Sequence, residues 1–281
     1  PISTTPNSQN AMILYAMFLG YNQEDSSILN KQTVERGFLR GVYYKMDTIE
    51  IEKNQSVRVP RPRETMYIRN NPYNKLDESG VVEIGQMIEP GDIVVGIVVE
   101  LAQVTENGKR YLDKSSTYEN NETGRVVSVV TKLDGEDKFI MITYEYERSM
   151  SIGDKMSSRS GNKNVCGILI PHNDMPHTRS GMRPDIIINP ASIPTRMTLA
   201  QVFETTISKL AAKKGVFLDG TVYTSFDSHE LIDELEKEGL AIRDEMINGI
   251  TGEMFNVALF YGPQTIMRIP KFVKEDRHAI G

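Results

Sequence analysis

The middle of the chain alternates short apolar runs with turn residues. Each run is rich in β-branched and aromatic residues and has the length of a β-strand. Glycine, proline, asparagine and aspartate separate the runs. We therefore predict a small β unit with a polar excursion between Thr105 and Thr123. The predicted strands are residues 81–84, 92–99, 124–131 and 138–146.

The flanking segments carry further strand patterns. Residues 10–19 form a mostly apolar run, which indicates a buried strand or the start of a helix. Residues 58–63, RVPRPR, contain two prolines and predict an extended boundary segment. Later in the chain, residues 185–189 predict a short strand that Pro190 ends, and residues 255–261 predict another.

Two helical patterns lie between these last strands. Apolar residues recur with helical spacing over residues 199–212, and Thr198 with Gln201 matches a capping box, in which the two side chains bond the first backbone N–H groups. A second amphipathic helix is predicted over residues 228–238, where Gly239 ends it. The predicted fold class is α+β with the β part dominant.

Composition narrows the class of protein. The 281 residues are 39% hydrophobic and 25% charged, and no apolar run approaches the ~18 residues of a membrane-spanning helix. The single cysteine, Cys166, excludes an internal disulfide framework and is expected to be a small buried hydrophobe. The first residues lack the basic-then-apolar order of a signal peptide. We therefore expect a cytoplasmic protein.

The charge is unevenly distributed. The net charge is −6, which by itself disfavours a polyanionic ligand. Residues 1–150 have a net charge of −5 and residues 215–281 a net charge of −6, whereas residues 151–214 hold 9 Lys and Arg against 4 Asp and Glu. A local basic surface on an acidic body is therefore predicted.

The basic region contains the motif GDKMSSRSGNKN at residues 153–164. Lys155, Arg159 and Lys163 stand there among small residues, which allow a ligand to approach closely. A lysine ammonium is a compact charge with three donors, so the motif suits phosphate oxygens. The alternative is a solvated loop with surface lysines.

The motif is one of several that together resemble the C-terminal half of the second-largest, β-type subunit of multisubunit DNA-directed RNA polymerases. They stand in the same order over residues 10–281. The matching segments are GYNQEDS at 20–26, LDESGVVEIG at 76–85, PGDIVVG at 90–96, GDKMSSRSGNK at 153–163, DMP at 174–176, DIIINP at 185–190, IPTRMT at 193–198 and KFVKEDRHA at 271–279.

The resemblance implies a domain organisation. Residues 1–63 and 148–197 would form the two parts of a double-psi β-barrel. Residues 64–147 would be a flap-like insertion, and residues 198–281 a helical region that follows the RNA–DNA hybrid toward the clamp.

The resemblance also implies site residues. Lys155 and Lys163 match lysines that contact the RNA 3′ end and nucleotide phosphates, and Arg196 matches an arginine that holds the triphosphate. An arginine fork bonds two phosphate oxygens at once. The alternative for Arg196 is a stem packed at the strand-to-helix junction.

Acidic and peripheral residues complete the expected site. Glu24 and Asp25 match an acidic pair near the second, nucleotide-borne Mg²⁺, which such carboxylates can hold through water. The alternative is that they bond lysines or arginines of the barrel. His278 and Arg159 are candidate contacts of the initiating nucleotide, although the charged run around His278 is equally compatible with a solvated helix end.

Other features are less specific. His172 and His177 flank Asp174, but two histidines five residues apart without a cysteine are weak zinc spacing, so we expect no metal site there. Ser160 stands where the family usually has histidine, and Asn164 where it usually has glycine. Asn164 must therefore accept less backbone freedom or adopt a positive φ.

The implied function is RNA synthesis from nucleoside triphosphates on a DNA template. Catalytic Mg²⁺ would be bound mainly by a β-prime-type partner, and the remaining N-terminal part of the β-type subunit and an initiation factor at the flap would be further partners. The alternatives are a catalytically idle structural subunit and a stand-alone RNA- or phosphate-binding protein. Mixed archaeal, eukaryotic and bacterial motif variants, together with the missing ends, suggest a split subunit encoded by a virus or large bacteriophage, or a partial sequence.

Overall fold

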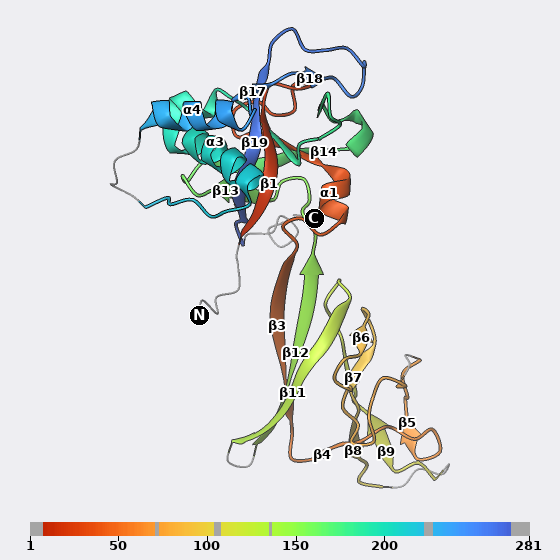
Figure 1. Ribbon diagram of the computed structural model, residues 1–281. Helices are drawn as coiled ribbons and strands as arrows, with labels where there is room; N and C mark the ends of the chain where they lie inside the picture. The colour runs from red at the N-terminus through yellow and green to blue at the C-terminus, as the bar shows by residue number, and fades with distance from the viewer. Residues whose placement is uncertain (1–7, 71–72, 104–107, 135–136, 222–226, 271–281) are drawn as a thin grey trace. The chain divides into compact units, whose positions relative to one another are not determined.

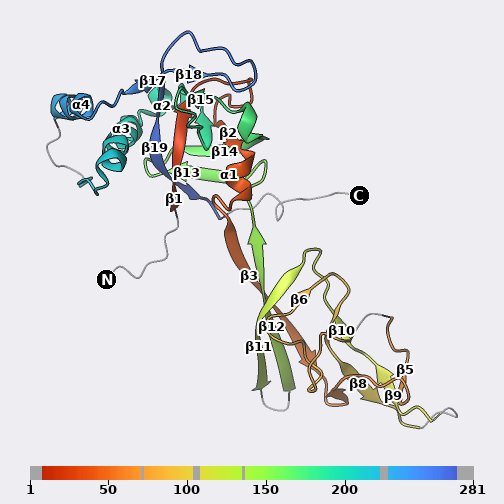
Figure 2. The same cartoon turned by 45° about the vertical axis from the view of Figure 1, so that its right-hand side comes forward.

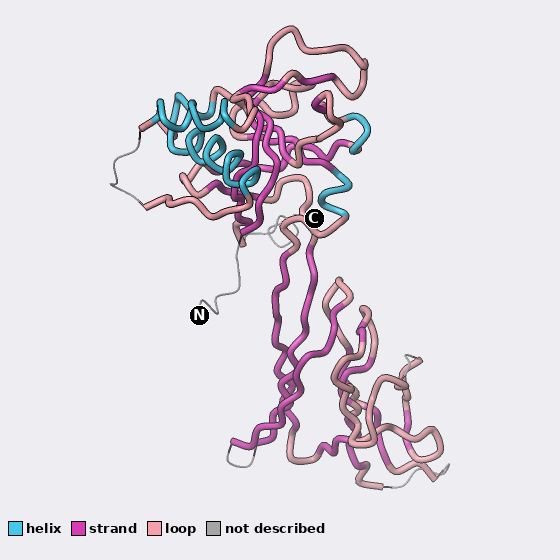
Figure 3. Tube along the Cα trace, viewed as in Figure 1, coloured by secondary structure: helices cyan, strands magenta, loops and turns pink. Residues whose placement is uncertain are grey.

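A computed structural model of the protein describes residues 8–70, 73–103, 108–134, 137–221 and 227–270. The chain divides into two compact units. Residues 1–41 and 149–281 form the first, here called the barrel unit, and Val42–Arg148 form the second, here called the insertion unit. Within the described residues, helices occur only in the barrel unit (Figure 3). The expected α+β class with a dominant β part is thereby confirmed.

Six strands of the barrel unit form a closed ring. Each strand is hydrogen-bonded to the next, and β19 returns to pair with β1. The β1–β16 and β2–β14 pairs are parallel, and the other four pairs are antiparallel. In ring order the strands are β1 (Ser8–Tyr15), β16 (Ile186–Ile188), β2 (Ser26–Asn30), β14 (Lys163–Ile170), β13 (Lys155–Ser158) and β19 (Leu259–Arg268).

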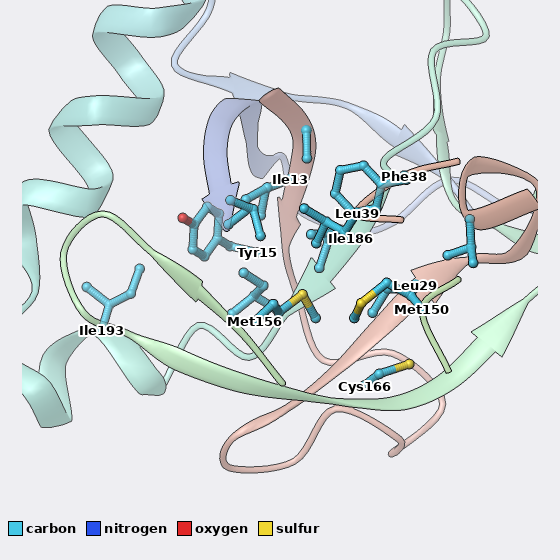
Figure 4. Close-up of a cluster of buried hydrophobic side chains, with 14 residues drawn as sticks. Ile13, Tyr15, Leu29, Phe38, Leu39, Met150, Met156, Cys166, Ile186 and Ile193 are labelled. Atoms are coloured by element: carbon cyan, nitrogen blue, oxygen red, sulfur yellow. The ribbon is translucent and has the colours of Figure 1, made fainter. Parts of the chain in front are cut away.

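Strands β1, β2 and β16 carry buried apolar residues on both faces, which explains their apolar runs. Alternate residues of a strand point to opposite faces. Ile186 and Ile188 belong to a core cluster with members from all six strands, which is therefore the barrel interior (Figure 4). Ile187, between them, joins Leu14 and Ile28 in a second cluster on the outer face. Burial on both faces favours strands made almost entirely of isoleucine, leucine and valine.

Helices and short strands cover parts of the barrel. Helix α3 lies against β19 (Figures 1 and 2). The antiparallel pair β15–β18 and the edge strand β17 complete the unit. The bounds are α1 (Lys31–Glu35), η1 (His172–Asp174), β15 (His177–Thr178), α2 (Ser192–Arg196), α3 (Leu199–Lys214), α4 (Ser228–Lys237), β17 (Arg243–Asp244) and β18 (Met246–Ile247).

The insertion unit consists of strands around a tyrosine-rich core. Tyr118, Tyr144 and Tyr146 are almost fully buried with aliphatic residues. The strands form the sheets β3-β12-β11-β6, β4-β8-β9-β5 and β10-β7. Their bounds are β3 (Gly41–Ile51), β4 (Gln55–Val57), β5 (Thr65–Met66), β6 (Met87–Ile88), β7 (Ile93–Val95), β8 (Ile97–Glu100), β9 (Tyr111–Asp113), β10 (Ser116–Thr117), β11 (Gly124–Asp134) and β12 (Asp137–Arg148).

Most predicted elements are confirmed, with three corrections to the strands. Residues 81–84 form only isolated bridges, since Val81 and Val82 are buried without a continuous ladder. Residues 92–99 divide at Gly96 into β7 and β8. The strand predicted at 255–261 instead runs over Leu259–Arg268, because pairing with β1 and β13 carries it through Pro263.

The predicted capping box is wrong. Thr198 precedes α3, but its side chain makes no capping hydrogen bond. Gln201 is fully buried and bonds other side chains instead. The predicted apolar stripe is also partly wrong, because α3 turns Gln201, Thr205 and Leu210 inward and leaves Leu199 exposed. Tertiary hydrogen bonds outweigh the local motif here.

Candidate nucleic-acid interface

The two lysines of the motif stand on one face of the β13–β14 hairpin. Lys155 pairs with Val165, and Ser157 pairs with Lys163. Paired residues, and residues two apart on one strand, share a face, so Lys155 and Lys163 are diagonal neighbours, which typically lie about 7–8 Å apart. Both side chains are exposed, whereas Met156 and Asn164 point to the buried face. The hairpin therefore presents two ammonium groups together.

The turn of the hairpin explains why the motif is rich in small residues. Gly161 has φ +77° and its N–H donates to the carbonyl of Ser158. Asn164 lies in β14 opposite Met156 and is not among the residues with positive φ. Asparagine thus replaces the family's usual glycine in ordinary extended backbone.

The loop before β2 brings Glu24 and Asp25 beside this hairpin. The amide of the buried Asn22 donates to the carbonyl of Ala16, at 2.6 Å, and accepts from the N–H of Phe18. The loop lies close to β14, since a Cβ at Gly167 would come within 2.6 Å of the carbonyl oxygen of Tyr21. The N–H of Val165 donates to the carbonyl of Asp25, so β14 and the acidic pair are adjacent.

Arg196 meets both segments. It is the last residue of α2, and Met197, in the left-handed conformation, ends the helix. Its Nη2 forms an ion pair with Asp25 Oδ1, and its Nη1 donates to Asn162 Oδ1 at 3.0 Å. The Arg196 side chain is 36% exposed and that of Asp25 54%. The structure thus shows Asp25 bonding an arginine of the barrel unit, while Glu24 is exposed with φ +49°.

A chain of buried amides continues inward from Arg196. Asn162 Nδ2 donates to Gln201 Oε1 at 3.0 Å and to Ser192 Oγ at 3.2 Å. Gln201 Nε2 donates to Gln264 Oε1 at 3.3 Å, which also accepts from the Tyr15 hydroxyl at 2.9 Å. Burial raises the pKa of Tyr15 to about 12, so its hydroxyl stays a donor at neutral pH.

A buried ion pair lies directly before the lysines in the chain. Asp154 Oδ2 accepts from Arg268 Nη2 at 2.6 Å, and the two side chains are 2% and 8% exposed. Arg268 also donates to the carbonyls of Leu39 and Ser149. Asp154 in turn accepts from the N–H of Ser151. These bonds fix the start of β13.

The remaining predicted residues are less central. Arg159 Nη1 lies 3.8 Å from Glu204 Oε1 and is 63% exposed. His278 lies outside the described residues, so its role stays a prediction. Cys166 is buried as expected, and burial, followed by the nearby Asp154, raises the pKa of its thiol to about 12. Burial lowers the pKa of His172, whose ring bonds Asn30.

A comparison with known families identifies the family of this chain. The family described as RNA polymerase Rpb2, domain 6, matches residues 2–280. The chain belongs to this family.

Individual relatives of this Rpb2-family chain agree. It is 34% identical to the DNA-directed RNA polymerase subunit 2 of Acanthamoeba polyphaga mimivirus and 34% identical to the DNA-directed RNA polymerase II subunit 2 of Arabidopsis thaliana. It is 32% identical to a probable DNA-directed RNA polymerase II subunit RPB2 homolog of Invertebrate iridescent virus 3. Each match covers 98% of the chain and 24–25% of the relative. The chain thus spans about a quarter of the length of these relatives.

Over residues 8–270, apart from the undescribed gaps, no three His, Cys, Asp or Glu side chains are grouped as a metal site would require. None of the helices that the structure describes has the length and apolarity needed to cross a bilayer.

Sequence reasoning missed the residues that hold the site together. Asn22, Asn162, Gln201 and Arg268 carry no signal as isolated letters. Asn22 and Asn162 do lie inside the quoted motifs GYNQEDS and GDKMSSRSGNK. A polar residue inside a functional motif is the one sequence signal that could have indicated them.

Proposed function

We propose that this chain supplies phosphate-binding residues to the active centre of a DNA-directed RNA polymerase. The observation that carries the proposal is that the exposed Lys155 and Lys163 lie on one face of the hairpin, with Arg196 held by the hairpin and a neighbouring loop, in a chain of the Rpb2 family. The polymerase would extend RNA by attack of the 3′ hydroxyl on the α-phosphate of a nucleoside triphosphate, with release of pyrophosphate.

The three basic residues would share this work. The two lysines would offset charge near the RNA 3′ end as the bond to the α-phosphate forms. Arg196 would hold the triphosphate, since a guanidinium always carries its charge and matches pairs of phosphate oxygens. Arg159, at the hairpin turn, and His278 are proposed contacts of the initiating nucleotide.

The proposal includes the finer architecture of the family. The closed ring of six strands, with two parallel pairs among antiparallel ones, would be a double-psi β-barrel built from residues 1–63 and 148–197. Residues 64–147 would be the flap-like insertion, and residues 198–281 the region leading toward the clamp. The compact insertion unit starts earlier, at Val42, and β19 joins the barrel from the last region.

Magnesium fits these residues only through water. Glu24 and Asp25 are exposed carboxylates, and Asp25 already bonds Arg196. These two residues therefore do not supply the full set of oxygens that direct coordination of the ion would require. Mg²⁺ keeps several waters readily, which allows such carboxylates to hold its hydration shell. When bound, the ion would neutralise phosphate charge, and a β-prime-type partner would provide its main ligands.

The partners follow from the same proposal. They are a β-prime-type subunit, the rest of the β-type subunit, an initiation factor at the flap-like insertion, template DNA, RNA and nucleoside triphosphates. We propose that the complex works in the cytoplasm, or in the host cytoplasm if the gene is viral.

The test is nucleotide addition by the reconstituted complex. We expect Lys155→Ala, Lys163→Ala and Arg196→Ala each to slow addition about 100-fold or more, while the subunits still assemble. Lys31→Ala is the matched control, because Lys31 is an exposed lysine that pairs with Glu35, four residues later on the same helix. Wild-type rates in all three variants would contradict the proposal.

Purification separates the two alternatives. A polymerase subunit must co-purify with β-prime-type and remaining β-type chains. Co-purification with wild-type rates in the three variants would favour an idle structural subunit, and tight RNA binding by the chain alone, without partners, would favour a binding protein.

A further inference from the structure

Asn162 connects the exposed Arg196 to the interior of the barrel unit. It lies between Gly161 and Lys163 and is fully buried. Its side chain forms three hydrogen bonds with other described residues: Oδ1 accepts from Arg196, and Nδ2 donates to Ser192 and Gln201. Its backbone also closes the hairpin, because its carbonyl accepts from the N–H of Ser158. One residue thus joins the lysine hairpin to the arginine.

The direction of every bond in the chain follows from Arg196. A guanidinium only donates, so the oxygen of the Asn162 amide must face it and the nitrogen must face away. That nitrogen donates to the oxygen of Gln201, which turns the Gln201 nitrogen toward Gln264. The bonds therefore specify one orientation for each amide, and a reversed amide would set two donors or two acceptors against each other.

The inner end of the chain is anchored in the barrel. Gln264 lies on β19, and its Oε1 accepts from both Gln201 and Tyr15. Its Nε2 is buried and finds no hydrogen-bond partner among the described residues. An unpaired buried donor is costly. The two hydrogen bonds from Tyr15 and Gln201 to Oε1 therefore determine the orientation of the Gln264 amide, at the expense of its own Nε2.

Helix α3 carries Gln201 in a closely packed position. A Cβ at Gly262 would lie 2.9 Å from Thr205 Cγ2, so the helix and β19 approach as closely as a glycine permits. Gln201 and Thr205 are both fully buried. The Gln201 amide therefore has little freedom to follow a displaced Asn162.

We propose that Asn162 and Gln201 are positioning residues that hold the Arg196 guanidinium ready for a triphosphate. This inference rests on the proposed function. Asn162 bonds Nη1 and Asp25 bonds Nη2, and the amide chain behind Asn162 fixes where Nη1 lies. Asp25 is exposed and carries the charge that an incoming phosphate would displace, whereas the neutral, buried Asn162 would stay in place.

The experiment measures the apparent KM for nucleoside triphosphate and kcat in the reconstituted polymerase. We expect Asn162→Ala to raise KM about 5–10-fold and Gln201→Met, which keeps the side-chain length but removes the amide, to raise it about 2–5-fold. The change in kcat should be smaller in both. Arg196→Ala is the reference for complete loss, and it should raise KM further.

Two additional variants separate positioning from general stability. In the Arg196→Ala background, Asn162→Ala should have no further effect on KM, because its only route to the triphosphate is then gone. Thr206→Val is the matched control. Thr206 is also buried on α3, but its hydroxyl bonds the carbonyl of Val202 on its own helix, so KM should not change.

Each outcome has one meaning. Wild-type KM in Asn162→Ala and Gln201→Met, with a defective Arg196→Ala, overturns the positioning role and leaves the proposed function intact. An effect of Asn162→Ala that persists undiminished in the Arg196→Ala background also overturns it, since the role would then be structural. Wild-type KM in Arg196→Ala itself overturns the proposed function. If Asn162→Ala fails to assemble, Gln201→Met alone decides in the same way.

Discussion

Each compact unit buries an arginine that pairs with a carboxylate, and the two carboxylates differ in their exposure to water. In the barrel unit Arg268 pairs with Asp154, whose side chain is 2% exposed. In the insertion unit Arg148 pairs with Glu122, whose side chain is 36% exposed, and also bonds Tyr43. The first pair is almost completely removed from water, whereas the second has one partner at the surface. The cost of separating the partners should differ accordingly.

The surroundings of the two arginines explain this difference. Arg268 bonds Leu39 and also Ser149 and Asp154, which lie in the segment that leads into the lysine hairpin. Arg148 lies over the ring of Tyr43, 4.6 Å from its centroid, in a core of stacked tyrosines. A buried ion pair thus fixes the start of the lysine hairpin in the barrel unit, whereas Arg148 packs on an aromatic ring in the insertion unit.

The largest effect is expected from breaking the buried pair. Asp154→Ala removes the carboxylate that pairs with the buried Arg268 guanidinium and should destabilise the barrel unit by about 3–5 kcal/mol. Glu122→Ala removes a partly exposed partner, so water can reach part of the Arg148 guanidinium. This variant should therefore lower the stability of the insertion unit by only about 1–2 kcal/mol. Hydrogen exchange of peptides from each unit is the measurement, because it reports each unit separately.

The comparison between the two variants contains its own control. Asp154→Ala should accelerate exchange in β13 and β14 more than in β11 and β12, and Glu122→Ala should do the reverse. Equal losses of protection in the two variants would refute the distinction between a fully and a partly buried ion pair.

A smaller effect distinguishes two neighbouring phenols of the insertion unit. The Tyr146 hydroxyl lies 2.5 Å from that of Tyr118, so Tyr146→Phe should cost about 1 kcal/mol through the lost hydrogen bond. The Tyr144 hydroxyl is buried without a partner among the described residues. Tyr144→Phe removes a desolvated polar group and should leave stability unchanged or raise it by about 1 kcal/mol.

Urea unfolding of the wild-type chain, Tyr146→Phe and Tyr144→Phe, monitored by hydrogen exchange in β11 and β12, measures the effect of each hydroxyl on stability. The two substitutions remove the same atom from the same core, so each is the control of the other. A larger loss in Tyr144→Phe than in Tyr146→Phe would contradict the hydrogen-bond assignment.

The fold could be predicted from sequence where local pattern and tertiary pairing agree. Residues 185–189 and 228–238 have strong local patterns, and the structure contains β16 and α4 there. Strand β19 differs from its local pattern, since it extends to Met267 through pairing with β1, which lies some 250 residues earlier, and to Arg268 through pairing with β13. Local periodicity contains no information about so distant a partner.

The candidate site could be predicted in part for a similar reason. Lys155, Lys163, Arg196 and Asp25 have residue types that suggest phosphate chemistry, and the structure brings Arg196 to Asp25 across 171 positions. Asn162 and Gln201 are ordinary amides whose importance depends on the bonds between them. Gln201 even had a plausible local role as part of a capping box, and the tertiary amide chain took precedence.

The smallest effect concerns Cys166, which lies beside Asp154 in the barrel unit. Its N–H donates to the Asp154 carbonyl, and its pKa of about 12 is raised by burial and by the Asp154 charge. Because the folded pKa lies above the unfolded value of about 8.5, the thiol at pH 8 is less ionised in the folded chain than in the unfolded one. The native chain should therefore resist a thiol reagent at pH 8, and the chain in urea should react at one thiol.

Asp154→Ala should speed labelling of the Cys166 thiol in the native chain, because looser packing exposes the thiol and removal of the Asp154 charge favours its ionisation. Glu122→Ala should not change the rate of labelling. Rapid stoichiometric labelling of the native wild-type chain would show that this part of the barrel interior is accessible to solvent. The distinction between the buried Asp154–Arg268 pair and the partly exposed Glu122–Arg148 pair would then be contradicted.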